Sequence, residues 1–224
     1  YRGKLAATIA SAVHDDTVLP GKLTEDDIER YQAMTREPVC ANFRVYRICT
    51  TPPPSSGATV LQILGILEQL PKPLPAAATT DWIHRFAEAS KLSFADRDTY
   101  IADPAFINVP IAAMLAPDYL AKRAQLINPE RAATDVLPGQ PLPALARLMA
   151  TSPEHPSTSH LSIVDSAGNA VSMTTSIQMA FGSGIMVGGF LLNNQMTDFS
   201  FVPRNADQEL IANRIEPGKR PRSS

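Results

Sequence analysis

The amino-acid sequence predicts an α+β fold in which layers of helix and sheet stack on one another. Helix-type spacing of apolar residues dominates residues 1–135, and strand-type alternation dominates residues 158–200. Between these regions the composition changes, because five prolines fall between residues 136 and 157: Pro138, Pro141, Pro143, Pro153 and Pro156. Helices and strands that are separated in this way along a chain are typical of α+β proteins.

Length and composition are those of an ordinary globular protein. The chain has 224 residues, enough to bury a sizeable core in one or two domains. Hydrophobic residues make up 44% and charged residues 19%. Because 20 Lys and Arg stand against 22 Asp and Glu, the net charge of −2 indicates neither a nucleic-acid partner nor a polybasic membrane contact. No apolar run reaches the roughly 18 residues of a membrane-spanning helix.

Two helices are expected near the N-terminus. Apolar residues at four-residue spacing predict an amphipathic helix over residues 4–14: Leu5, Ile9 and Val13. A short helix should follow Thr24, because a hydroxyl residue with Asp27 three positions later resembles a capping box.

The two cysteines lie in strand-like runs that we expect to pair as a hairpin. No His or Cys stands at ligand spacing from Cys40 or Cys49, so they do not indicate a metal site. Two unpaired thiols in a core are the default expectation. The hairpin would bring both sulfur atoms near each other, and a disulfide therefore stays open.

A proline-rich stretch, residues 52–58, precedes the first of two long helices. Its three prolines should keep it extended, and one of its two serines can cap the helix. Gly57 would permit close approach of a neighbouring segment. The helix itself, residues 58–70, is apolar nearly all round and should be buried between layers, with Gly65 marking tight packing.

The second long helix is expected over residues 81–97, and it ends in the run FADRDTY. In that run, Asp96 and Arg97 are most simply explained as a helix-end ion pair, with each other or with neighbours. From residue 136 to Ser157 the prolines exclude an interior strand. This segment should be an accessible connector with one short helical run, residues 144–150.

Residues 160–176 read HLSIVDSAGNAVSMTTS and predict two strands joined by a tight turn. Side chains alternate across a strand, so Leu161 and Ile163 should face one side and His160 the other. Glycine and asparagine in the turn suit a positive φ. A further apolar strand that ends in polar residues is expected within residues 188–201.

A cluster of hydroxyl residues, Ser157 to Ser159, stands directly before this hairpin. It is either ordinary turn chemistry or a nucleophile at the edge of a sheet. A hydroxyl is a weak nucleophile until a base accepts its proton, and His160 lies two residues from Thr158. No G-x-S-x-G motif indicates an α/β-hydrolase arrangement. If the chain were cut before Thr158, the new α-amine, with a pKa of about 8, would itself be a suitable base.

Seven stretches resemble the gamma-glutamyltransferase family and occur in that family's order: PPPSSGA, FADRDTY, DPAF, STSHLSIVDSAGNAVSMTTSI, FGSGI, GGFLLNNQMTDFS and EPGKRPRSS. The resemblance implies an N-terminal nucleophile hydrolase with an αββα four-layer sandwich, of which this chain holds part. It also implies a zymogen that cleaves itself between Ser157 and Thr158. Residues 1–157, mostly helical, would be the C-terminal part of a large subunit. Residues 158–224, rich in strands, would be the N-terminal part of a small one.

The same resemblance implies roles for individual residues. Thr158 would attack the γ-carbonyl of γ-glutamyl amides such as glutathione, forming an acyl-enzyme that water or an amino acid resolves. Ser176 stands where the family has a Thr that orients this nucleophile. Five further positions match residues around the amino-acid end of the substrate: Gln178, Gln195 and Asp198 at the α-ammonium, and Ser223 and Ser224 at the α-carboxylate.

Two departures keep alternatives open. Gln178 stands where the family usually has Asn, and its extra methylene shifts the ammonium contact, so a related acylase of the cephalosporin or glutaryl type is an alternative. The chain also stops inside the KRPRSS motif, ahead of the family's oxyanion-hole glycines. We therefore expect a fragment of a longer protein, and an inactive family fragment is the remaining alternative. The resemblance implies no cofactor and no metal, a heterodimer of the cleaved subunits, and a periplasmic or secreted location.

Overall fold

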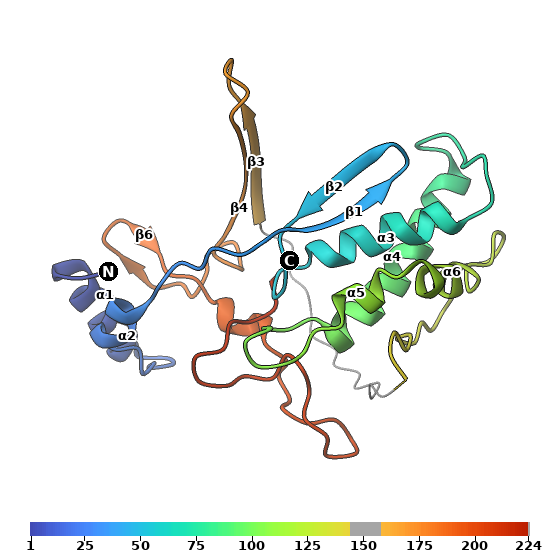
Figure 1. Cartoon of the computed structure of the whole chain (residues 1–224). Coiled ribbons are helices and arrows are strands. Elements are labelled where there is room, and N and C mark those ends of the chain that lie inside the picture. Colours follow the sequence, from blue (N-terminus) through green and yellow to red (C-terminus); the bar gives the residue numbers. More distant parts are fainter. Residues whose placement is uncertain (144–157, 224) are drawn as a thin grey trace. The chain divides into compact units, whose positions relative to one another are not determined.

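The computed structural model of the chain describes residues 1–143 and 158–223, and its elements are labelled in Figure 1. The described residues form two compact units: 1–35 with 158–197, and 36–143 with 198–223. The boundary at residue 197 falls within the short 3-10 helix η1 (Gln195–Asp198). These compact units differ from the two subunits predicted on either side of residue 157. That division describes a cut in the chain, and it stays a prediction. The short helical run expected at residues 144–150 lies outside the described residues.

In the first unit, two helices and two short sheets follow one another along the chain. They are α1 (Lys4–His14), α2 (Glu25–Arg30), β3 (Thr158–Val164), β4 (Ala170–Ser176), β5 (Met186–Val187) and β6 (Phe190–Leu191). The bounds of α1 are those that the apolar spacing predicts. α2 begins with the expected capping box, because the Thr24 side chain accepts from the Asp27 N–H and the Asp27 carboxylate accepts from the Thr24 N–H.

Strands β3 and β4 form the predicted antiparallel hairpin, in which Thr158 lies opposite Ser176 at the open end. The turn at the other end is closed by Asp165, whose carboxylate accepts from the backbone N–H of Asn169 at 2.8 Å. The Asn169 side-chain amide, with the backbone N–H groups of the turn, holds the pKa of Asp165 below its ordinary range. Gly168 takes a φ of 85°, as the turn requires.

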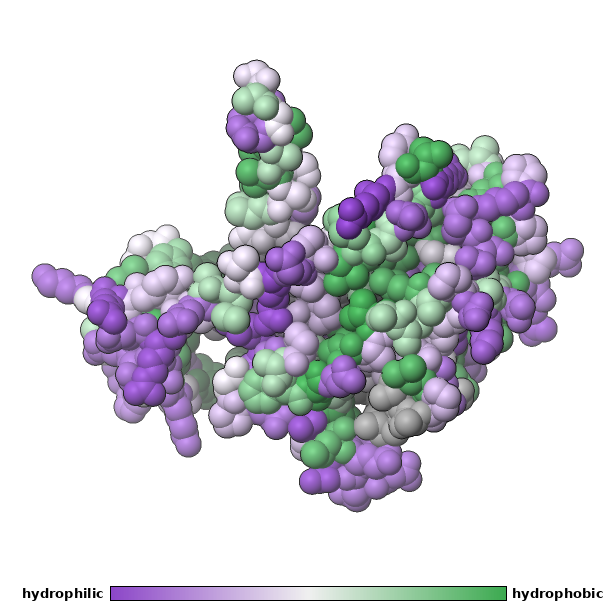
Figure 2. All heavy atoms as spheres, viewed as in Figure 1, coloured by the Kyte–Doolittle hydropathy of each residue, from purple (hydrophilic) through white to green (hydrophobic). Residues whose placement is uncertain are grey.

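The two faces of this hairpin differ in polarity, as the alternation predicts. One face carries the apolar side chains of Leu161, Ile163, Val171 and Met173, all of them exposed, and green spheres run along the hairpin in Figure 2. The other face carries a row of hydroxyls and His160. An apolar strand forms within residues 188–201, as predicted, but it is only the two-residue β6. Gly188 and Gly189 both take a positive φ and turn the chain back onto β5 just before it.

The second unit contains four helices and one hairpin. These elements are β1 (Val39–Phe43), β2 (Tyr46–Thr50), α3 (Gly57–Gln69), α4 (Thr80–Tyr100), α5 (Ile111–Met114) and α6 (Pro117–Ala124). Helix α3 is buried against α4 and α6, in a core of Ile63, Ile66, Leu67, Leu70, Ala89, Leu92, Leu120 and Ala124. No helix in the described part of the chain is both long and apolar enough to span a bilayer.

Glycines allow the close packing that the sequence predicts around α3. A Cβ atom on Gly65 would lie 2.7 Å from Leu120 Cδ1, so α6 approaches α3 at this point. A Cβ atom on Gly57 would collide with the Thr51 carbonyl oxygen. The proline stretch before α3 turns instead of running extended, and the Ser55 N–H donates to the Pro52 carbonyl at 3.1 Å.

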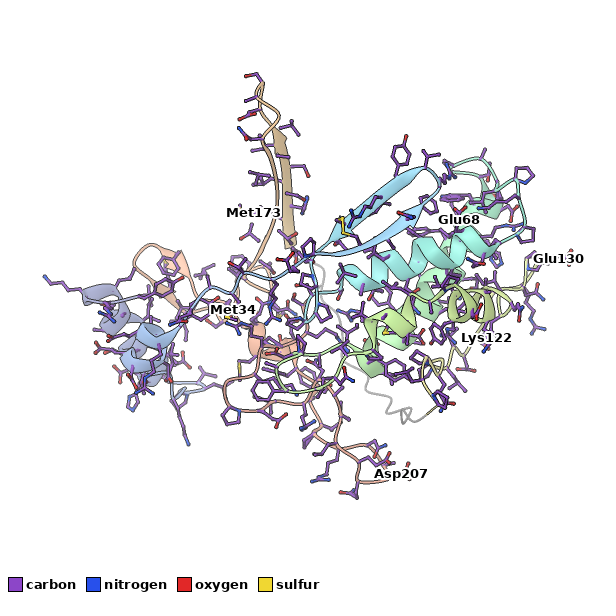
Figure 3. The ribbon with its side chains drawn as sticks, in the orientation of Figure 1. Met34, Glu68, Lys122, Glu130, Met173 and Asp207 are labelled. Atoms are coloured by element: carbon purple, nitrogen blue, oxygen red, sulfur yellow. A yellow bond between two sulfur atoms is a disulfide. The ribbon has the colours of Figure 1, made fainter. Side chains whose placement is uncertain are left out.

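The two cysteines form a disulfide, so the default expectation of unpaired core thiols is wrong. Strands β1 and β2 pair antiparallel with Cys40 directly opposite Cys49, and their Cα atoms lie 4.1 Å apart. The disulfide is the yellow bond across this hairpin in Figure 3. Cys49 is exposed, which places the pair on the hairpin surface and not in the core.

A buried carboxylate joins the helices of the second unit. The Asp96 side chain on α4 is fully buried and accepts hydrogen bonds from Gln62 on α3 and from the Tyr119 hydroxyl on α6 at 2.7 Å. It also accepts from the Gly139 N–H at 2.6 Å and pairs with Arg123 at 3.1 Å. Burial and the neighbouring carboxylate raise the pKa of Tyr119 above its ordinary range, so the hydroxyl keeps the proton that it donates.

We predict that Asp96→Ala lowers the free energy of unfolding by about 3–5 kcal/mol, because Arg123 would remain buried without this partner. Chemical denaturation followed by circular dichroism measures the change. Asp81→Ala on the same helix is the matched control, since Asp81 is itself exposed and pairs with Arg85. Its loss should cost about 1 kcal/mol or less. Equal effects of the two substitutions would contradict a central role for Asp96.

Candidate active site

The first unit brings Thr158 and Ser176 together at the open end of the β3–β4 hairpin. Thr158 Oγ1 donates a hydrogen bond to Ser176 Oγ at 3.2 Å. The antiparallel register places these two residues opposite each other. Ser176 Oγ also accepts from the backbone N–H of Gln178 at 2.9 Å. The serine hydroxyl is therefore held between the first residue of β3 and the loop that follows β4.

That loop brings Gln178 to Gln195. The Gln195 side-chain amide donates to Gln178 Oε1 at 3.3 Å, and Gln178 is buried. Asn194 ties the two segments, because its side-chain oxygen accepts from the Met179 N–H at 3.0 Å and its own N–H donates to the Ile177 carbonyl at 3.3 Å. Thr158, Ser176, Gln178 and Gln195 thus form one continuous series of hydrogen bonds.

Gln178 holds an unusual backbone conformation. Its φ of 74° lies in the left-handed region, which disfavours most side chains. Asparagine visits this region more readily than glutamine, because its short amide hydrogen-bonds its own backbone. An Asn would therefore suit this backbone position better than the Gln that this chain carries.

His160 is hydrogen-bonded to neighbouring hydroxyls on the polar face of the hairpin. Its Nδ1 lies 2.8 Å from Thr174 Oγ1, and its Nε2 lies 3.1 Å from both Ser162 Oγ and Ser172 Oγ. These contacts fix the ring along the hairpin, two register positions from the Thr158–Ser176 pair and on the same face. A role of His160 as the base for Thr158 stays a hypothesis.

In the second unit, Ser223 lies against the proline-rich stretch that precedes α3. Its backbone N–H donates to the Pro54 carbonyl at 3.1 Å, and its hydroxyl lies 3.2 Å from that of Ser55. The Ser56 hydroxyl donates to the Ser223 carbonyl at 2.6 Å. Ser56 is the N-cap residue of α3, but its side chain makes no capping hydrogen bond. Both stretches carry the family resemblance, but nothing in their sequence indicates that they contact each other.

Two residues at the C-terminal end of α4, Arg97 and Asp98, contact the residues around Ser223. Arg97 Nε donates to Ser56 Oγ at 2.6 Å, and its guanidinium also donates to Asp98 at 3.1 Å. Asp98 in turn pairs with Arg222 at 2.9 Å. The ion pairing expected at Asp96 and Arg97 is confirmed with neighbours and not between the two residues: Arg97 pairs with Asp98, and Asp96 pairs with Arg123. Asp96 turns into the core, whereas Arg97 reaches the loop before α3.

The predicted site residues divide between the two units. The first unit holds Thr158, Ser176, Gln178 and Gln195, and the second holds Asp198, half-buried at the end of η1, and Ser223. Two predicted residues, Ser157 and Ser224, lie outside the described residues. The roles implied for all of them stay predictions. Among residues 1–143 and 158–223, no group of three or more His, Cys, Asp or Glu side chains could hold a metal ion.

Comparisons with known proteins define the class first. The structure is similar to that of the cephalosporin acylase from Bacillus halodurans, with a TM-score of 0.80 and 30% identity over 100% of this chain and 37% of that chain. The chain is α+β, as predicted, and its solved neighbours are N-terminal nucleophile hydrolases. A strand that opens at Thr158, beside a serine hydroxyl, is consistent with that class.

The family follows from the sequence. The model of the gamma-glutamyltranspeptidase family matches residues 1–224. The chain is also 38% identical over 234 residues to the glutathione hydrolase proenzyme of Bacillus subtilis strain 168. It is 34% identical over 225 residues to the acylase ACY 1 proenzyme of Pseudomonas sp. strain SE83. This chain belongs to the gamma-glutamyltranspeptidase family.

The match covers much more of this chain than of its relatives. All of the chain aligns with the Bacillus subtilis proenzyme, but it spans only 38% of that protein's length. For the Pseudomonas acylase the shares are 98% and 36%.

Proposed function

We propose that the complete gene product carrying this sequence hydrolyses or transfers γ-glutamyl groups from amides such as glutathione, through an acyl-enzyme on Thr158. The observation that carries the proposal is the hydrogen bond from Thr158 Oγ1 to Ser176 Oγ at the open end of a hairpin. Gln178 and Gln195 continue that series of hydrogen bonds. The name of the Bacillus subtilis relative, a glutathione hydrolase proenzyme, supports the same substrate class.

The proposed chemistry requires Thr158 to be an N-terminal residue. Its free α-amine then accepts the proton of Oγ1, and Oγ1 attacks the γ-carbonyl carbon of the substrate. The amide C–N bond breaks, and the leaving amine takes the proton from the α-ammonium. A γ-glutamyl ester on Thr158 remains. Water or the amino group of an amino acid attacks this ester, and the released hydroxyl regains its proton. Ser176 would orient Oγ1 throughout.

Substrate selection would depend on the charges of the γ-glutamyl group. Gln195 and Asp198 offer oxygen acceptors to the α-ammonium, and a carboxylate is the stronger acceptor for a cation. Ser223 and Ser224 offer hydroxyl donors to the α-carboxylate. A group recognised at both charges is distinguished from a neutral acyl chain, which leaves these polar residues without partners.

Self-cleavage would produce two subunits that remain together as a heterodimer. Contacts within the second unit join residues from either side of the proposed cut, among them Asp98 with Arg222. We place the protein in an oxidising compartment, the periplasm or the cell exterior. The exposed disulfide between Cys40 and Cys49 supports this location, since cytosolic reductants keep such thiols reduced.

The complete gene product should cleave itself between Ser157 and Thr158. N-terminal sequencing of the smaller product should read Thr-Ser-His-Leu, and Thr158→Ala should accumulate as an uncleaved precursor. Ser159→Ala is the control, because Ser159 lies on the opposite face of β3 and should leave cleavage intact. A product that begins at Ser157 or Ser159 would show that the nucleophile is misassigned.

Asp198→Ala should reduce γ-glutamyl turnover far more than self-cleavage, because the substrate's ammonium is absent during processing. Removing one partner of a buried charge pair costs about 2–5 kcal/mol, which would appear as a large loss in kcat/KM. Asp207→Ala is the matched control, since Asp207 lies in an exposed loop of the same unit (Figure 3). Equal losses of cleavage and turnover in Asp198→Ala would indicate a structural role.

A related acylase is the second candidate function. Gln178 favours it, because glutamine replaces the asparagine that the family resemblance implies at an ammonium contact. The chain is also similar to proteins named acylases from Bacillus halodurans and Pseudomonas. An acylase would accept a glutaryl group, which has the same carboxylate as a γ-glutamyl group but no ammonium.

The variant Gln178→Asn should raise the preference for a γ-glutamyl anilide over a glutaryl anilide. The shorter amide suits the φ of 74° and would restore the usual contact. A site built to bind a polar group rejects an analogue without it by up to about 10⁴-fold. The ratio of kcat/KM values for the two substrates, in both proteins, is the measurement. A ratio that is large already and does not move would remove the residue-level argument for the acylase.

A further inference from the structure

Asn213 connects the two backbone segments that carry the proposed substrate-binding residues of the second unit. Its side-chain amide nitrogen donates to the backbone carbonyl of Asp198 at 2.7 Å. Its side-chain oxygen accepts from the backbone N–H of Arg222 at 3.0 Å, directly before Ser223. One planar amide therefore spans from the residue proposed to bind the ammonium to the residue next to the proposed carboxylate site.

The chemistry of the amide makes this bridge specific. Asn213 is fully buried, so water does not replace either hydrogen bond. Asparagine carries a donor and an acceptor at fixed separation, whereas aspartate carries acceptors alone and alanine carries neither. The backbone carbonyl of Asn213 accepts from the Ser200 N–H at 2.9 Å, which fixes the residue itself beside the segment that follows Asp198.

The Arg222 end of the bridge is held independently. Arg222 is buried, and its guanidinium pairs with Asp98 at 2.9 Å. The next residue, Ser223, is held through its backbone by Pro54 and Ser56. Because this end is anchored on the loop before α3 and on α4, the amide of Asn213 sets where Asp198 lies with respect to it.

We propose that Asn213 is a positioning residue that sets the spacing between Asp198 and Ser223, and so allows both charges of one γ-glutamyl group to be held at once. The inference rests on the proposed function. The α-ammonium and the α-carboxylate of the substrate share one carbon atom, so their separation is fixed. Two contacts reinforce each other only when the protein matches that separation.

Three anilides test the proposal on the complete gene product. A γ-glutamyl anilide presents both charges, a 4-aminobutanoyl anilide presents only the ammonium, and a glutaryl anilide presents only the carboxylate. Asn213→Ala should lower kcat/KM for the γ-glutamyl substrate by about tenfold to a hundredfold, because a small misplacement has an effect of this size. Turnover of the two single-charge substrates should change little, so the preference for γ-glutamyl over each of them should shrink.

The matched control is Asn205→Ala. The Asn205 amide also makes two hydrogen bonds, but both go to Glu209 in its own turn, at 2.8 and 3.1 Å. This variant should leave all three substrates and their ratios unchanged. Asn213→Asp, which keeps the acceptor for Arg222 and removes the donor to Asp198, should show the same reduced preference as Asn213→Ala.

The possible outcomes separate this proposal from the proposed function. An unsubstituted protein without γ-glutamyl turnover would overturn the proposed function, and this inference with it. If the unsubstituted protein is active, equal losses on all three substrates in Asn213→Ala would overturn the spacing role alone. Unchanged ratios of kcat/KM between the γ-glutamyl substrate and the two single-charge substrates would also overturn the spacing role. If circular dichroism shows that neither Asn213 variant folds, the residue is structural and the proposal fails.

Discussion

The buried carboxylate of Asp96 fixes where helix α4 lies in the second unit. Because its oxygens accept from α3, from α6 and from the chain at Gly139, the helix cannot slide or rotate without leaving polar groups unpaired. The residues that follow on α4, Arg97 and Asp98, are thereby aimed at the loop before α3 and at Arg222. A hydrogen-bonded core position thus determines where the proposed carboxylate-binding serine lies.

Local sequence patterns predict those features of the fold that depend on residues close together in the chain, such as helix bounds and helix caps. The spacing of apolar residues gave the bounds of α1, and the Thr24–Asp27 pair marked the start of α2, because helix periodicity and capping involve residues within a turn of each other. Gly57 and Gly65 are points of close approach, as the sequence predicts, but no local pattern identifies Thr51 or Leu120 as the neighbours. Partners far apart in sequence are set by tertiary packing.

The same limit explains the errors. The register of the β1–β2 hairpin, which places Cys40 opposite Cys49, cannot be distinguished from neighbouring registers by composition alone. Ser56 suits a cap by residue type, but a more distant acceptor, the Ser223 carbonyl, holds its hydroxyl. Thr158 can be predicted as a nucleophile from the sequence, because a proline-rich connector, a hydroxyl residue and the start of a strand follow one another there. No sequence pattern marks Asn213. Its role depends on hydrogen bonds to Asp198 and Arg222, which the sequence does not predict.

The seven residue pairs of the β3–β4 hairpin make the placement of Thr158 sensitive to chain length. Thr158 meets Ser176 because the count from the Asp165 turn to each of them is matched. Deleting one residue within 170–175 would present Ile177 to Thr158, or force a bulge, since side chains alternate with a period of 2. Insertions and deletions in β4 are therefore constrained by parity. A two-residue change preserves which face each remaining side chain occupies, and a one-residue change reverses it.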